Sequence, residues 1–198
     1  MAAPRGVVPP NLPIAPVNYQ QRYQDQFGNV LRLFFNSIAN YINGPVAHAS
    51  YYDTTTQTNP VADAVNLFSF NSVISQFLIS RSVPPTKIYV QDTGVYNFQF
   101  SAQLDKTGGS ASSVYIWPRI NGVNVPNSAT KIVIDGPNAE TVPAWNFLLV
   151  MGAGDYFELA WESPDTNVVI AADPATGNIP AIPSIILTVN WVSNVEAQ

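Results

Sequence analysis

The alternation between Val95 and Leu104 constrains the fold of this sequence more than any other feature. In "VYNFQFSAQL" polar Asn, Gln and Ser residues occupy every second position. The apolar positions between them carry Tyr96, Phe98, Phe100, Ala102 and Leu104. Successive side chains of a β-strand point to opposite faces of its sheet, so this segment is predicted to be a strand with one buried face.

Short segments of the same kind continue to the C-terminus. Each is rich in β-branched and aromatic residues and is bounded by Gly, Pro, Asn or Asp. Asn121–Gly122 marks a two-residue hairpin, because both positions of such a turn favour positive φ. Pro118 cannot donate to a strand ladder, so its strand is expected at a sheet edge or at a bulge. The pattern predicts an all-β domain over residues 64–198, an antiparallel sandwich of about ten strands.

The N-terminal part of the chain has a different character. Residues 1–17 contain five prolines, which predict an extended arm because proline fixes φ and removes a hydrogen-bond donor. Two interpretations stay open: a disordered tail, or an arm that becomes ordered along a neighbouring subunit. The apolar residues between the prolines favour the second. Residues 44–63 show no periodicity and are interpreted as a linker.

Residues 18–43 are predicted to form one amphipathic helix. Apolar residues recur every three or four positions, the period of one helix face. The resulting stripe contains Tyr23, Phe27, Leu31, Phe34 and Ile38. Gly28 inside the helix costs about 1 kcal/mol relative to Ala, which indicates a close contact or a bend. A stripe of this kind needs a partner, which is the β domain, a symmetry mate or another protein; we interpret it as an assembly anchor.

The composition excludes several classes of protein. Only 11% of the residues are charged while 46% are hydrophobic, so other chains are expected to cover part of the surface. The net charge of -5 and the scattered Lys and Arg residues argue against nucleic-acid binding. No stretch approaches the roughly 20 apolar residues that insert across a membrane. There is no cysteine, which excludes disulfides and thiolate metal sites. The N-terminus lacks the apolar core of a secretory signal, so we expect a protein kept inside a cell or released by lysis.

Candidate catalytic and metal-binding groups are few. The single histidine, His48, lies in the predicted linker, where a rigid catalytic arrangement is not expected. Glu158 and Glu162 share one face of a predicted strand but stand about 13 Å apart along it, too far for a glycosidase pair. Asp155 and Asp165 in flanking turns offer oxygen ligands for calcium. We expect neither an enzyme nor a bound cofactor, and a solvated strand face for the two glutamates.

The aromatic residues are interpreted as core or interface groups. Trp161 and Trp191 alternate with the predicted buried positions and are expected in the core. Tyr115 and Trp117 occupy one face of their strand, and that face points to solvent or into a neighbouring subunit. Exposed aromatic residues of this kind are enriched at interfaces and also stack on sugars.

Four segments in order resemble the complement-type globular head and its tumour-necrosis-factor-like jelly-roll relatives. They are "TKIYVQDTGVYNFQFSA", "INGVNV", "GAGDYFELAWE" and "PSIILTVNWVS". The resemblance covers roughly residues 64–193 and implies a jelly roll that assembles as a homotrimer around a three-fold axis. It implies that the predicted core and trimer strands carry Tyr96, Phe98, Phe100, Phe157 and Trp161.

The whole chain also resembles virion proteins of tailed phages, those of marine cyanobacteria especially. The Asn-rich, charge-poor composition and the segment "PPNLPIAPVNYQQRYQDQFGNVLRLFFN" carry this second resemblance. It implies a structural protein of the virion, bound to capsid or tail proteins through its N-terminal arm and helix. The alternative is a receptor-binding knob that recognises host surface glycan through loops such as 105–113 and 172–183.

Overall fold

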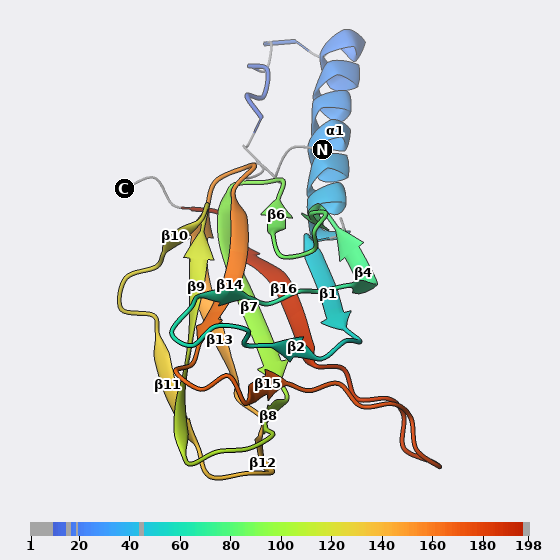
Figure 1. Cartoon of the computed structure of the whole chain (residues 1–198). Coiled ribbons are helices and arrows are strands. Elements are labelled where there is room, and N and C mark those ends of the chain that lie inside the picture. The colour runs from blue at the N-terminus through green and yellow to red at the C-terminus, as the bar shows by residue number, and fades with distance from the viewer. Residues whose placement is uncertain (1–9, 15–16, 19, 44–45, 196–198) are drawn as a thin grey trace. The chain divides into compact units, whose positions relative to one another are not determined.

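In the computed structural model the described residues are 10–14, 17–18, 20–43 and 46–195. The chain divides into two compact units, Met1–Pro45 and Val46–Gln198. The first unit contains one helix and the second contains all the strands of the described chain (Figure 1). The predicted domain boundary at residue 64 therefore does not coincide with the structural one.

The helix α1 spans Gln21–Asn43 and is the only regular element among the described residues of the first unit. The predicted stripe lies along one side of it, and its five side chains are half-buried. Tyr23 stacks on Phe27 at 6.1 Å between ring centroids, and the Tyr23 hydroxyl donates to the carbonyl oxygen of Pro13. Part of the proline-rich arm thus contacts the helix of its own unit. Most of the arm lies outside the described residues.

Sixteen strands form three antiparallel sheets in the second unit. The first sheet contains, in spatial order, β13 (Ala144–Met151), β7 (Gly94–Ala102), β16 (Ile185–Ser193), β1 (His48–Asp53) and β4 (Ser72–Phe77). The second contains β10 (Val123–Asn124), β9 (Ser112–Ile120), β14 (Tyr156–Glu162), β6 (Ile88–Val90) and β5 (Ile79–Arg81), with β11 (Thr130–Ile134) beside β9 and β3 (Asn66–Leu67) beside β14. The third contains β12 (Ala139–Thr141), β8 (Leu104–Lys106), β15 (Val168–Ile170) and β2 (Gln57–Thr58).

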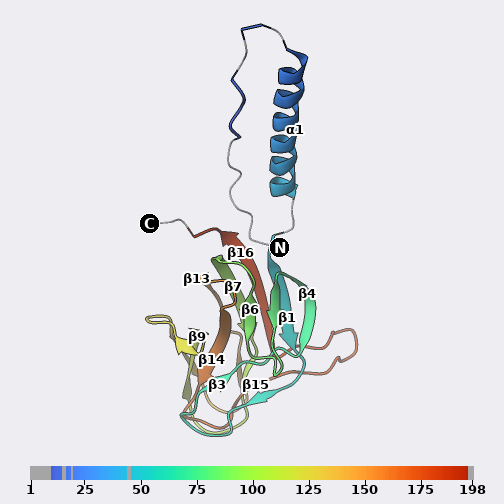
Figure 2. The same ribbon diagram turned by 90° about the horizontal axis from the view of Figure 1, so that it is seen from above.

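The two larger sheets make a jelly-roll sandwich. The chain passes from β1 of the first sheet to β3 of the second, back to β4, and over to β5 and β6. It returns at β7 and crosses again at β9, β13, β14 and β16. The first long strand, β1, lies beside the last, β16, and the six residues of β1 pair with it from His48↔Asn190 to Asp53↔Ile185. Figure 2 shows β1 between β16 and β4. The predicted sandwich is confirmed, although several of the sixteen strands have only two or three residues.

Strand β1 corrects the prediction of a linker over residues 44–63. Its burial alternates, with Ala49, Tyr51 and Asp53 facing inward. This strand was missed in the sequence because one of its inward side chains is the carboxylate of Asp53, which breaks the apolar alternation. Asp53 is fully buried, yet its side chain accepts hydrogen bonds from the Thr55 amide and hydroxyl groups and from the Asn71 amide, which satisfies the charge locally.

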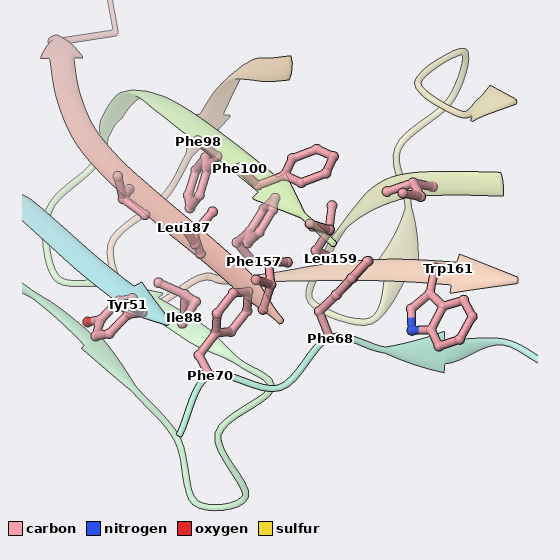
Figure 3. Packing of buried hydrophobic residues seen from close by; sticks show 14 of the residues in the cluster. Tyr51, Phe68, Phe70, Ile88, Phe98, Phe100, Phe157, Leu159, Trp161 and Leu187 are labelled. Carbon is pink, nitrogen blue, oxygen red and sulfur yellow. The ribbon is translucent and has the colours of Figure 1, made fainter. Parts of the chain in front are cut away.

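The core lies between the first and second sheets. Figure 3 shows Phe98, Phe100 and Leu187 from the first sheet opposite Phe157, Leu159 and Trp161 of β14. Phe68 and Phe70, which follow β3, fill the space beside them. The five residues predicted for the core or trimer strands are each at most 2% exposed, so their side chains belong to the core of a single subunit.

Two local predictions near β9 have different outcomes. Asn121 and Gly122 have φ of 52° and 77°, so the two-residue hairpin forms as expected. Pro118, in contrast, neither places β9 at an edge nor interrupts its register with β14, because β14 pairs continuously along one side of β9 and β10 and β11 pair along the other. Pro118 falls between the stretches that pair with β10 and with β11, where that side of the strand needs no donor.

Candidate functional site

The outward face of the first sheet is a surface of unusual composition on the second unit. Its five strands contain one charged residue among Lys, Arg, Asp and Glu, and that residue is the buried Asp53. Cross-strand pairing places polar groups in its middle, such as Gln99 opposite Thr188. We call this surface the uncharged face.

Large apolar side chains stand exposed on the strands of the uncharged face. Leu148 and Val150 on β13 are 62% and 61% exposed, and Ile74 on β4 is 68% exposed. Leu148 and Val150 alternate along β13 with the buried Leu149 and Met151, so the pleat of the strand fixes their outward direction. Apolar residues gathered in this way mark protein–protein contact surfaces.

The second sheet carries its charges on its own outward face. Arg119 and Glu158 are cross-strand neighbours on β9 and β14, with 3.7 Å between Nη1 and Oε2. Glu162 lies opposite Tyr115 further along the same two strands. Glu158 and Glu162 therefore share a face, as predicted. The expectation of a solvated face is wrong for Glu158, which is only 3% exposed and forms an ion pair with Arg119.

A groove of about 630 Å³ lies on this outward face of the second sheet. It is bounded by β9, the end of β14 and the segment that joins β10 to β11, which projects from the sandwich in Figure 1. The lining residues are Tyr115, Trp117, Asn124, Val125, Asn127, Ser128, Ala129 and Glu162. Aromatic rings, amides and one carboxylate thus meet in one hollow, which we call the β9 groove.

The geometry of the β9 groove follows from strand pairing and from one turn. Trp117 lies opposite Ala160 of β14, whose small side chain leaves room over the sheet. The Trp117 indole Nε1 donates to Asn124 Oδ1 at 2.9 Å, which fixes the ring beneath the segment that joins β10 to β11. We call this segment the wall of the groove. Asn127 has a φ of 57°, a left-handed conformation that asparagine tolerates, and it turns the chain back toward β11.

The aromatic residues of this groove were recognised from the sequence, but the groove itself was not predicted. Tyr115 and Trp117 were expected on one outward or interfacial face, and they do lie together, Trp117 at 8% exposure under the wall. The wall itself was missed, because Asn, Pro and Ser residues in a turn have no periodicity. The Asn-rich composition of "NVPNS" next to an aromatic strand was the available signal.

The other predicted polar groups do not come together. Asp155 accepts hydrogen bonds from Asn121 and Gly152, whereas Asp165 pairs with Lys106. They flank the two ends of the seven-residue β14, which places them about 20 Å apart. No group of three or more His, Asp or Glu side chains among the described residues is arranged to hold a metal ion.

His48 and Trp191 lie in places that the sequence did not predict. His48 belongs to β1, where its Nε2 lies 3.1 Å from the Ser75 hydroxyl. Trp191 is half-buried instead of fully enclosed, and its indole covers Gly94 so closely that a Cβ there would lie 2.3 Å from Nε1.

The ion pair between Lys106 and Asp165 is the most buried charge interaction of the described chain. The Lys106 side chain is fully buried and that of Asp165 is 19% exposed. The hydrogen bond from Lys106 holds the pKa of the Asp165 carboxyl below its ordinary value, and hydrogen bonds from Asn167 add to this effect. The pair joins β8 to the turn after β14, so we interpret it as a structural ion pair, which we call the brace, and not as a reactive group.

No helix among the described residues is long and apolar enough to cross a bilayer.

Comparison with known proteins adds a likeness of fold. No family model matches the sequence, and no curated protein matches it. Among solved structures, the globular domain of zebrafish complement 1qA protein aligns over 75% of this chain and 99% of its own, with 12% identity and a TM-score of 0.45. Murine APRIL aligns over 74% of this chain and 100% of its own, with 8% identity and a TM-score of 0.47. The fold assignment rests on the strand order of the chain itself: the second unit is an antiparallel jelly-roll sandwich, as the sequence motifs predicted.

Proposed function

We propose that this chain is a structural protein of the virion of a tailed phage, which projects a homotrimeric jelly-roll head from an N-terminal anchor. The observation that supports assembly is the uncharged face: its strands contain no exposed Lys, Arg, Asp or Glu, while Leu148 and Val150 stand open to solvent. A surface of this kind is stable when another surface covers it.

A further copy of the same chain is the partner that fits this face. The protein carries a net charge of -5, so two copies repel each other through most surfaces. The uncharged face is the exception, because copies that meet there bring no formal charges together. Assembly around a three-fold axis, instead of a two-fold one, follows from the resemblance of the motifs to complement-type heads.

The helix supports the attachment half of the proposal. Besides the half-buried stripe, Leu33 and Phe35 are 55% and 61% exposed. In a helix they lie about 100° to either side of Phe34, so apolar groups extend over most of the circumference near Phe34. A helix with so wide an apolar surface is typically enclosed by protein. Capsid or tail proteins would enclose it in the assembled virion; the alternatives are the helices of the two sister subunits or the head of the same chain.

Oligomeric state tests the first half of the proposal. Val150→Lys places a charge on the uncharged face, and Val133→Lys places one on β11 of the other sheet at a residue of similar exposure, 61% against 57%. Light scattering of the full chain should give a trimer for the natural protein and for Val133→Lys, and a monomer for Val150→Lys. A monomeric natural protein at micromolar concentration, or a trimer that tolerates both lysines, would overturn the assignment of the interface.

Incorporation into particles tests the second half. Replacing Phe27 and Phe34 by Ser should leave the trimeric head folded but absent from assembled virions, because burying each ring contributes about 1.5–3 kcal/mol to attachment. Gln26→Ser with Asn36→Ser is the matched control, since both residues are exposed positions of the same helix. Normal copy number of the Phe27/Phe34 variant would move the attachment site to the head. Absence of the natural chain from purified virions would overturn the virion assignment.

A further inference from the structure

The β9 groove contains polar groups that have no hydrogen-bond partner among the described residues. The Glu162 carboxylate makes no hydrogen bond or ion pair with any described residue, although it is half-buried. The Tyr115 hydroxyl and the Asn127 amide are likewise unpaired among the described residues. These groups line the same hollow as the fixed ring of Trp117. The groove therefore presents acceptors and donors at its rim and an aromatic surface at its floor.

We infer that the β9 groove is a binding site for a neutral saccharide. A sugar ring offers C–H groups on its faces, which pack on aromatic rings, and hydroxyl groups around its edge, which pair with carboxylates and amides. Glu162 supplies acceptors only, whereas the Asn127 amide supplies both donors and an acceptor. A volume of about 630 Å³ lies within the range of small-ligand sites and accommodates one or two sugar rings.

The charge of the groove selects against the other classes of ligand. Of the described residues that line it, none is Lys or Arg, so a sulfated or carboxylated sugar finds no counter-charge beside Glu162. Lys131, which does not line the groove, is placed over the Tyr115 ring, with 5.9 Å from Nζ to the ring centroid. A wholly apolar ligand would leave the Glu162 carboxylate desolvated without a partner, which is costly.

The position of the groove leaves it open in the proposed assembly. It lies on the outward face of the second sheet, whereas the uncharged face belongs to the first sheet on the other side of the sandwich. Saccharide binding itself does not depend on trimerisation. Three copies on one particle would add avidity, because each further contact of a bound particle is intramolecular. The site is distinct from loops 105–113 and 172–183, which the sequence suggested for glycan recognition.

Saturation-transfer NMR on the full chain tests the inference. The probes are glucose, galactose, mannose and N-acetylglucosamine with their common disaccharides, and N-acetylneuraminic acid as the anionic comparison. At least one neutral sugar should receive saturation from the protein, and adding the corresponding disaccharide should reduce that signal by competition for the same site. Tyr115→Ala should weaken that binding about tenfold or more, and Glu162→Gln should weaken it less, because the amide keeps one acceptor.

Tyr89→Ala is the matched control, since Tyr89 is also a half-buried tyrosine of the second sheet but packs on Tyr156, outside the groove. It should bind sugar as the natural protein does. Unfolding midpoints measured for all three variants separate lost binding from lost structure. No transfer to any neutral sugar, preference for the anionic sugar, or equal binding by the Tyr115→Ala and natural proteins would each overturn the inference. A trimer that fails to bind sugar would leave the assembly proposal intact.

Discussion

The rings of Phe98 and Phe157 stack across the sandwich, with 4.1 Å between their centroids and 14° between their planes. Phe98 belongs to the first sheet and Phe157 to the second, and both side chains are fully buried. This contact links the two sheets inside the core shown in Figure 3. Strand β7, which the alternation of the sequence predicted, therefore lies in the core of the sandwich.

Phe98→Ala should lower the free energy of unfolding by about 3–5 kcal/mol, because it removes a buried ring and leaves a cavity. Chemical denaturation followed by tryptophan fluorescence measures the change. Val133→Ala, at an exposed strand position, is the control and should change stability by less than about 0.5 kcal/mol. A loss of only that size for Phe98→Ala would mean that the two sheets are held together elsewhere.

Asp165→Asn should destabilise the protein, because it leaves the buried ammonium group of Lys106 without its counter-charge. Breaking a buried ion pair costs about 3–5 kcal/mol, and the 19% exposure of the Asp165 side chain places this case at the lower end. Lys106→Met with Asp165→Asn removes both charges and should recover most of the loss. If the single and double variants unfold at the same denaturant concentration, the pair is not the source of the stability.

Acid should weaken the same brace. The pKa of Asp165 is lowered in the folded state by Lys106, so the contribution of this group is present above the unfolded pKa and is lost as pH falls through the folded pKa. Unfolding by urea at neutral pH and at successively lower pH should show a stability loss in the acid range. The Asp165→Asn protein should lose less over the same range, and parallel losses in both proteins would assign the acid sensitivity to other carboxyl groups.

Alkali should destabilise the core through its tyrosines. Burial raises the pKa of Tyr51 and of Tyr96 to about 12, with nearby Arg81 opposing the effect at Tyr51. A raised pKa means that the contribution to stability is complete below the unfolded pKa near 10 and is lost as pH rises through about 12. Tyrosinate absorbance should therefore appear together with unfolding, and not before it, for these two residues.

Tyr96→Phe separates the two effects of that hydroxyl. At neutral pH the variant loses the hydrogen bond from Tyr96 to the Asp92 carbonyl oxygen, 2.7 Å long, which costs about 0.5–1.5 kcal/mol. In alkali it should resist unfolding better than expected from that loss, because one buried hydroxyl no longer ionises. An unchanged slope of stability against pH above about 10 would exclude Tyr96 as a contributor.

The strands could be predicted where physical constraints act within one segment. The alternation in β7 and the positive φ of Asn121 and Gly122 depend only on neighbours in the chain, and both were recognised. The buried Lys106 was not, because its partner Asp165 follows 59 residues later and only the fold brings them together. The β9 groove was half predicted for the same reason: the aromatic residues are periodic, but the wall beside them is a turn.

The glycine in α1 gives a prediction that concerns attachment. A Cβ added at Gly28 would meet nothing within 4 Å among the described residues, so no contact within that part of the chain requires glycine there. Gly28→Ala should therefore stabilise the helix by about 1 kcal/mol, seen as slower amide hydrogen exchange along α1 of the full chain. If the same variant enters virions poorly, a partner backbone approaches at this residue; unaltered incorporation would remove Gly28 from the anchor.

The boundary of the head is decided by β1, and truncation tests it most sharply. A chain that begins at residue 46 keeps β1 and every strand pair of the sandwich, and it should unfold cooperatively. A chain that begins at residue 60 starts within the linker that the sequence predicted. It lacks β2 and the strand between β16 and β4, together with the buried Tyr51. The shorter chain should then expose the edge of β16, lose cooperative melting and aggregate.

Circular dichroism melting and light scattering of the two truncated proteins make the comparison. Tyr51→Ala in the 46–198 chain is the graded control, because it removes the buried ring and its hydroxyl contacts to Gln76 and Ile79 but keeps the strand ladder. Its stability should lie between those of the two truncations. If residues 60–198 melt as cooperatively as residues 46–198, then the sandwich folds without β1. In that case the head boundary predicted from the sequence would be correct for folding.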